Sequence, residues 1–98
     1  MSETSCRIDV WLWRARFAKS RSLAAAMVER GAVRLTHHGV QTRLDKPSRS
    51  VHVGDRLVFA QGGRLIELEV LALGERRGPP AEARALYSAV EDEPPIGG

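Results

Sequence analysis

The spacing of apolar residues predicts a helix near the start of the chain. Within residues 7–18, Ile8, Leu12 and Ala15 recur every three to four positions, which is the spacing of one face of a helix. Trp11 lies beside this stripe, and in a chain with so few aromatic residues we expect it to be a core residue rather than a base-stacking one. A second apolar stripe on this helix consists of Val10, Trp13 and Phe17.

A second helix is marked at both of its ends. Ser20 can act as the N-cap, because its hydroxyl can accept a hydrogen bond from a free backbone N–H of the first turn. Gly31 stands where the residue that follows a helix often adopts a left-handed conformation. We therefore expect a helix over residues 21–30. Its core-facing stripe is expected to consist of Leu23, Ala24, Met27 and Val28.

After Gly31 the hydrophobic period becomes two, which predicts β-strands. Val33 and Leu35 would face the core, and the residues that alternate with them would face solvent. Pairs that contain glycine mark three tight turns between the strands. The expected turns are at residues 38–39, 54–55 and 62–63, and the expected strands are at 33–36, 40–43, 51–53, 56–60 and 64–73.

The C-terminal part is expected to contain a helix over residues 81–90. Pro80 is acceptable at the first helical position, since a proline there loses no hydrogen bond. The apolar residues Ala83, Leu86 and Val90 follow at helical spacing.

One small domain is the expected organisation of the 98 residues. Its predicted fold class is α+β: two N-terminal helices, then a small, mostly antiparallel sheet, then a short C-terminal helix. The expected divisions are a flexible N-terminus at 1–6, a folded domain with a β extension at 7–74, a C-terminal helical segment at 75–90 and a frayed tail at 91–98.

The charge of the chain is unevenly distributed. The net charge is +3, but residues 1–60 hold 11 Arg and Lys against 5 Asp and Glu, whereas residues 61–98 hold 4 against 7. The first part therefore carries +6 and the second −3, which favours contact of the first part with a polyanion. A solvated surface with chance asymmetry explains the charge alone about equally well.

No pattern of catalysis, metal binding or cofactor binding is present in the sequence. It contains neither a GxSxG nucleophile turn nor a GxxxxGK[ST] phosphate loop. His37 and His38 are adjacent and would point to opposite sides of a strand, and Cys6 and His52 lack ligand spacing. Asp9 is expected to stabilise the positive end of the first helix rather than to catalyse. We expect no enzyme, no cofactor, no small-molecule substrate and no metal.

The location expected from the sequence is cytoplasmic. A single cysteine, Cys6, excludes a disulfide within the chain, which fits a reducing compartment. The apolar stretch at 8–13 is too short to span a membrane and is followed by Arg14 and Arg16. No membrane contact is therefore expected.

The start of the second helix carries the first indication of a binding site. Lys19 and Arg21 flank Ser20, where free backbone N–H groups and the helix dipole already favour an anion. Two cations at this end are mildly unfavourable for the isolated helix, and a bound phosphate would supply the missing negative charge. Cations that extend into water are the alternative interpretation.

Five stretches in order resemble an S4 RNA-binding domain (the αL motif) over residues 7–58. They are RIDVWLW at 7–13, KSRSLAAAMVERGAV at 19–33, THHGVQ at 36–41, KPS at 46–48 and VHVGDRLV at 51–58. A narrower resemblance, to the bacterial heat-shock protein 15 family, rests on RIDVWLWRARFAKSRSLA at 7–24 and ERRGPPAEARALY at 75–87.

These resemblances imply a non-catalytic RNA-binding protein that associates with the large ribosomal subunit at stalled or dissociated translation complexes. Family members often continue into a long basic extension, whereas this chain ends in the acidic EDEPPIGG, which would lower its ribosome affinity. The resemblance implies RNA contacts for Arg7, Lys19, Ser20, Arg21, Arg34, Lys46 and Ser48. Charge and position add Arg14, Arg16, Arg43 and Arg49.

Two other functions are compatible with the sequence. One is a protein-interaction adaptor that docks a partner through the acidic C-terminal part, with Leu86 and Tyr87 on its helix. The other is a stand-alone accessory S4 domain that acts on tRNA. In every case we expect a monomer.

Overall fold

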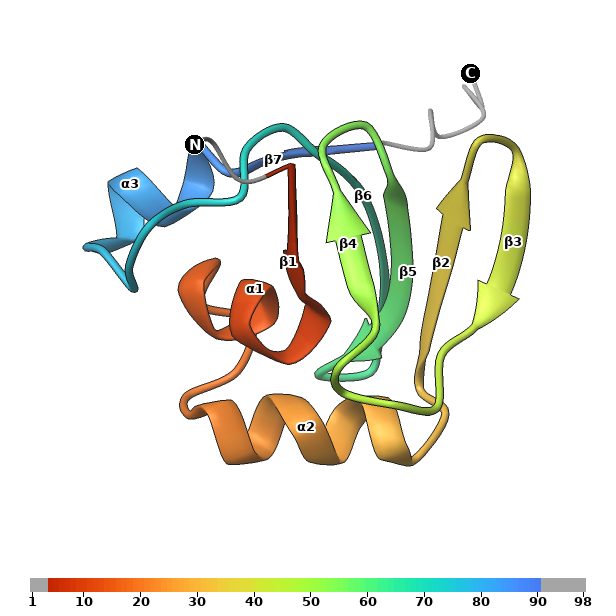
Figure 1. Ribbon diagram of the computed structural model, residues 1–98. Helices are drawn as coiled ribbons and strands as arrows, with labels where there is room; N and C mark the ends of the chain where they lie inside the picture. Colours follow the sequence, from red (N-terminus) through yellow and green to blue (C-terminus); the bar gives the residue numbers. More distant parts are fainter. Residues whose placement is uncertain (1–3, 91–98) are drawn as a thin grey trace, which may run out of the picture.

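The structure is a computed structural model and describes residues 4–90. These residues contain three helices and seven strands (Figure 1). The helices are α1 (Ile8–Arg14), α2 (Arg21–Glu29) and α3 (Pro80–Arg84). The strands are β1 (Ser5–Arg7), β2 (Val33–His37), β3 (Val40–Arg43), β4 (Ser50–His52), β5 (Arg56–Gln61), β6 (Arg64–Val70) and β7 (Tyr87–Ala89).

The strands form two antiparallel sheets. Five of them lie in the order β3-β2-β5-β6-β7, and β1 pairs with β4 in a separate two-stranded sheet. Along β2 and β5, Val33 lies opposite Phe59 and Leu35 opposite Leu57, so all four buried side chains share one face. The predicted α+β class with a mostly antiparallel sheet is confirmed.

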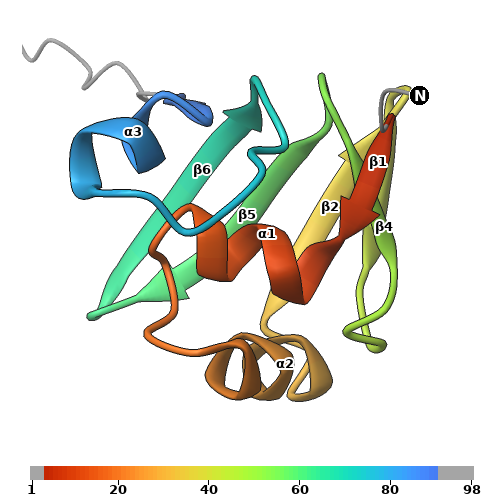
Figure 2. The same ribbon diagram turned by 60° about the vertical axis from the view of Figure 1, so that its left-hand side comes forward.

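Helix α1 supplies the centre of the core. It crosses one face of the five-stranded sheet (Figure 2), and Ile8, Trp11 and Leu12 have no exposed surface. The indole N–H of Trp11 donates to the Ala72 carbonyl at 2.9 Å, which satisfies the one polar group of this buried side chain. The prediction that Trp11 is a core residue is confirmed.

The first helix ends earlier than predicted. It stops at Arg14 rather than at residue 18, because the backbone takes a left-handed turn at Arg16 (φ +66°). This turn folds Phe17 back onto the core, where its ring lies 5.1 Å from that of Phe59. Ala15 remains buried as predicted.

The second helix follows the prediction closely. Ser20 accepts a hydrogen bond from the Leu23 N–H at 3.1 Å, and Gly31 has a φ of +76°. Ala24 and Val28 are buried, but Leu23 is 54% exposed, so its place in the core stripe was wrong. The buried face of α2 is therefore narrow, and the first turn of the helix at Leu23 is exposed to solvent.

The C-terminal segment differs most from the prediction. The helix expected over residues 81–90 covers only Pro80–Arg84, and the chain then pairs with β6 as strand β7. Pairing explains the change, because the Leu71 N–H donates to the Leu86 carbonyl at 2.8 Å and Tyr87 lies opposite Val70. Strand β6 accordingly ends at Val70 rather than at residue 73.

Two further expectations change at the chain's smaller elements. The N-terminus expected to be flexible is partly ordered, because Ser5–Arg7 form β1 against β4. Strand β4 covers Ser50–His52, and Val53 beyond it is 56% exposed. The expected tail at 91–98 lies outside the described residues. In the described residues no helix is long and apolar enough to cross a membrane.

Two leucines in different helices test this account of the core. Leu12→Ala should lower the free energy of unfolding by about 2–5 kcal/mol, because it opens a cavity beneath α1. Leu23→Ala, at an exposed position of α2, should change it by about 0.5 kcal/mol or less. Urea denaturation of both variants measures the two values. Equal destabilisation would contradict the assignment of Leu23 to the surface.

Candidate nucleic-acid interface

Arg7 stands at the junction of β1 and α1 and is held by a buried carboxylate. Its Nε and Nη2 atoms each donate to Asp9, both at 3.0 Å, while the Arg7 side chain remains 52% exposed. These hydrogen bonds, and the charge of Asp9, raise the pKa of Arg7 above its ordinary value. Asp9 also accepts the Val10 N–H at 2.8 Å, so it stabilises the start of the helix, as expected. The pair fixes the direction of one exposed guanidinium group.

The loop between β3 and β4 is attached to the same junction. The Ile8 N–H donates to the Arg49 carbonyl at 2.8 Å, and the Asp9 N–H donates to the Pro47 carbonyl at 3.3 Å. The pairing of β1 with β4 places Arg7 opposite Ser50. Segments some forty positions apart in the sequence therefore lie side by side. The predicted RNA contacts that this brings together, all exposed, are Arg7, Lys46, Ser48 and Arg49.

The start of α2 presents two more cations. Lys19 and Arg21 are exposed, and no acidic residue occupies the first turn of this helix. Within residues 4–90 neither side chain takes part in an ion pair. The hydroxyl of Ser20 is used by the cap, so one N–H of this turn has a partner and others stay available to an anion.

Helix α2 and the loop between β3 and β4 lie at the same end of the molecule, at the bottom of Figures 1 and 2. Figure 1 shows the loop beside the C-terminal half of α2, so the cations at the start of α2 lie further along the same end. We call this surface the cationic end. It consists of Arg7, Lys19, Ser20, Arg21, Lys46, Ser48 and Arg49.

Arg34 and Arg43 form a second pair of exposed cations. They lie directly opposite each other on β2 and β3. The Arg43 side chain also covers the end of α2, since a Cβ atom on Gly31 would lie 3.5 Å from its Cδ. A cation at this place stabilises the negative end of the helix, which gives Arg43 a structural role beside the predicted RNA contact.

Arg14 and Arg16 are turned toward the C-terminal segment instead. Arg14 donates to the Gly74 carbonyl at 2.9 Å, and Arg16 donates to the Gly78 carbonyl at 2.7 Å. These bonds fasten residues 73–78 to the end of α1. The RNA contacts predicted for the two arginines stay predictions. In the structure both side chains have a structural role, because they bind carbonyls of residues 73–78.

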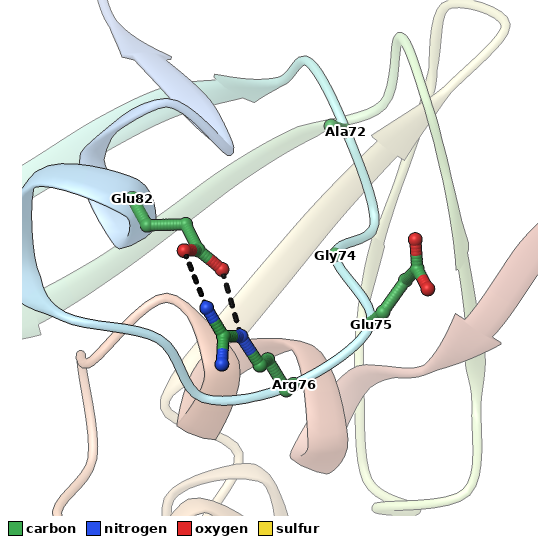
Figure 3. A pocket seen from close by; sticks show the side chains of 5 residues that line it. All are labelled: Ala72, Gly74, Glu75, Arg76 and Glu82. Atoms are coloured by element: carbon green, nitrogen blue, oxygen red, sulfur yellow. Dashed lines mark hydrogen bonds and ion pairs between the residues drawn. The ribbon is translucent and has the colours of Figure 1, made fainter.

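A shallow hollow near α3 has the opposite character (Figure 3). Glu82 accepts two hydrogen bonds from Arg76, at 3.2 and 3.1 Å, and these bonds keep the pKa of Glu82 below its ordinary value. Glu75 also lines the hollow. Two carboxylates against one paired arginine make this surface unfavourable for a phosphate backbone.

The histidines lie differently from what the sequence predicted. His37 and His38 do not point to opposite sides, because His38 adopts a left-handed conformation (φ +51°) and its ring stacks on that of His37 at 3.9 Å. His37 and His52 both approach the buried carboxylate of Asp55. The sequence did not reveal this cluster because it depends on the register of β2 and β5. Since Thr36 lies opposite Arg56, His37 lies opposite Asp55.

Comparison with known proteins places this geometry in a family. An S4 domain model matches residues 6–35, which cover most of β1, both N-terminal helices and the first part of β2. The heat shock protein 15 homolog of Haemophilus influenzae is 42% identical over 91 residues. The solved trimeric structure of Vibrio cholerae heat shock protein 15 superposes with a TM-score of 0.79 at 38% identity, covering 88% of this chain and 82% of that one. The chain belongs to the heat shock protein 15 family.

Coverage of the relatives is uneven. The chain spans 66% of the Haemophilus influenzae heat shock protein 15 homolog and 57% of the Escherichia coli K12 heat shock protein 15, which is also 42% identical. A more distant relative, the RQC P-site tRNA stabilizing factor of Listeria monocytogenes, is 29% identical over 90 residues, 92% of this chain and 91% of its own length. The S4 match and the heat shock protein 15 relatives support the prediction of an RNA-binding protein. The monomer expected for this chain stays a prediction, and the Vibrio cholerae protein was solved as a trimer.

Proposed function

We propose that this chain is a non-catalytic RNA-binding protein that binds the backbone of structured RNA through its cationic end. The observation that carries the proposal is the attachment of the loop between β3 and β4 to the start of α1. Two backbone hydrogen bonds, from Ile8 and Asp9 to that loop, bring cations from distant parts of the sequence to one surface. The exposed Lys19 and Arg21 extend this surface along α2.

The chemistry of the cationic end favours phosphate contacts over base readout. Its charged groups are exposed arginine and lysine side chains, which bind phosphates without regard to sequence. The start of α2 adds backbone N–H groups and the positive end of the helix dipole. Of the two tryptophans, Trp11 is buried in the core and cannot stack on a base, and Trp13 is only partly exposed. Recognition would therefore rest on the shape of the RNA.

The RNA that we propose is ribosomal RNA of the large subunit, bound in the cytoplasm during ribosome rescue or recycling or in the heat-shock response. Membership of the heat shock protein 15 family supports this choice. The name of the Listeria monocytogenes relative, an RQC P-site tRNA stabilizing factor, makes tRNA the competing target. The sequence-based alternative of an accessory S4 domain that acts on tRNA thus keeps a specific argument in its favour.

The adaptor hypothesis has less support. It required Leu86 and Tyr87 on an exposed helix that a partner protein could bind. Leu86 is only 7% exposed, and Tyr87 lies in β7 and packs against the core. The side chains proposed to meet a partner are therefore occupied within the fold.

Salt dependence tests whether phosphate contacts supply the affinity. If about five phosphates are engaged, log K for a structured ribosomal RNA fragment should fall by roughly three to four units per tenfold rise in salt. The double variant Lys19→Ala/Arg21→Ala should reduce this slope by about two, because each cation releases about one counterion. Fluorescence anisotropy at several salt concentrations gives both slopes.

A charge-matched variant is the control for that measurement. Arg64→Ala/Arg84→Ala also removes two exposed positive charges, but from β6 and α3, away from the cationic end. Its slope should equal that of the unmodified chain. If both double variants lose the same affinity, net charge rather than a defined surface explains binding, and the proposal fails.

The identity of the RNA is tested in cells. We expect ultraviolet crosslinking of the tagged chain, followed by sequencing of the attached RNA, to recover mainly large-subunit ribosomal RNA. The Lys19→Ala/Arg21→Ala variant should lose this enrichment at equal expression. Recovery dominated by tRNA would move the function to the competing target while leaving the cationic end intact.

A further inference from the structure

His37, His52 and Asp55 form a compact cluster that the RNA-binding function does not use. It lies at the upper ends of β2 and β4 in Figure 1, where β5 begins, away from α2. One nitrogen of each histidine and one oxygen of Asp55 all lie within 4.8 Å of one another. The three residues are thus brought together by two different sheets.

Asp55 is the fixed point of the cluster. It is only 3% exposed, and its Oδ2 atom accepts the backbone N–H of His52 at 2.9 Å. Its Oδ1 atom lies 2.5 Å from Nδ1 of His37. A backbone donor that orients a carboxylate in this way is typical of the groups that support a metal ligand.

His52 carries an atom that the protein does not satisfy. Its Nδ1 is buried and, among the described residues, has no hydrogen-bond partner. The same atom faces the Asp55 carboxylate, but its distance of 3.6 Å from Oδ2 is too long for a hydrogen bond. A simple hydrogen bond between His37 and Asp55 leaves this nitrogen unexplained.

The charge of the cluster selects the class of ligand. The buried carboxylate of Asp55 faces both imidazoles, and a carboxylate attracts a cation and repels an anion such as phosphate. Two imidazoles and one carboxylate suit zinc and similar divalent transition metals better than Mg²⁺ or Ca²⁺, which prefer oxygen ligands.

We infer that His37, His52 and Asp55 form a binding site for a divalent transition metal ion, with Zn²⁺ as the reference ligand. Bonds of about 2.0–2.2 Å to tetrahedral zinc place ligand atoms roughly 3.3 Å apart. The Nδ1–oxygen separations to Asp55 are 2.5 Å for His37 and 3.6 Å for His52, on either side of that value. The two histidine side chains are 39% and 40% exposed, so the core does not enclose their rings. The remaining coordination position would hold water.

The site would connect the two sheets. His37 belongs to β2 of the five-stranded sheet, whereas His52 belongs to β4 of the two-stranded sheet. A hollow lined by the three ligands is also lined by Ser48 and Arg49 of the cationic end. A bound metal would therefore hold β4, and the loop before it, against the larger sheet. This inference does not depend on the proposed RNA-binding function.

Calorimetric titration of the tag-free, metal-free chain with ZnCl₂ at neutral pH tests the site. We expect saturable binding of one Zn²⁺ per chain and a higher thermal midpoint in its presence. His37→Gln and His52→Gln should each lower the affinity at least about tenfold. Both changes are at half-exposed positions, and circular dichroism checks that the variants fold. Absence of saturable binding, or unchanged affinity in both variants, would overturn the site.

Two control variants make the assignment specific. His38→Gln removes the third histidine of the chain, which stacks on His37 but is not part of the ligand set. Cys6→Ser removes the one thiol. Both should bind Zn²⁺ within about twofold of the unmodified chain. Loss of binding in either control equal to that in His37→Gln would assign the metal to other ligands and refute the proposed site.

Discussion

The arrangement of the cationic end depends on how α1 satisfies the free backbone N–H groups of its first turn. The N-cap residue, Arg7, makes no side-chain cap; Asp9 accepts the Val10 N–H, and the N–H groups of Ile8 and Asp9 donate to carbonyls of the loop between β3 and β4. Leaving buried donors unpaired would cost about 1–3 kcal/mol each, so the loop is held firmly. Because Ile8 is buried beside these bonds, the core and the cationic surface are fixed by the same contact.

The electrostatic cost of two cations at the start of α2 is small compared with the free energy that stabilises this helix. Lys19 and Arg21 at the positive end of α2 cost about 0.3–1 kcal/mol each, whereas the Ser20 cap contributes about 1 kcal/mol and the burial of Val28 about 1.5–3 kcal/mol. The helix therefore forms without an anion. Arginines beyond the cationic end are partly occupied by the fold, as the hydrogen bonds of Arg14 and Arg16 to carbonyls in residues 73–78 illustrate.

Local signals in the sequence predicted local structure correctly. The Ser20 cap, the left-handed Gly31 and the left-handed turn at Gly39 are set by neighbouring residues, and all three are found. Non-local contacts decided the rest. Residues after Arg84 leave their helical pattern because β6 offers an unpaired edge, and His37 meets Asp55 only because β2 and β5 pair in one particular register. The sequence could identify the cations one by one, but the approach of Arg7 to Lys46, Ser48 and Arg49 depends on the attachment of the loop to α1.

The cations of the first half are proposed to act as one RNA surface. Amide chemical-shift mapping by NMR during titration with a structured ribosomal RNA fragment tests it most directly. We expect the largest shifts at the start of α1, at residues 19–22 and in the loop between β3 and β4, with little change in β6 and α3. Shifts spread evenly over the molecule, or concentrated on β6 and α3, would contradict it.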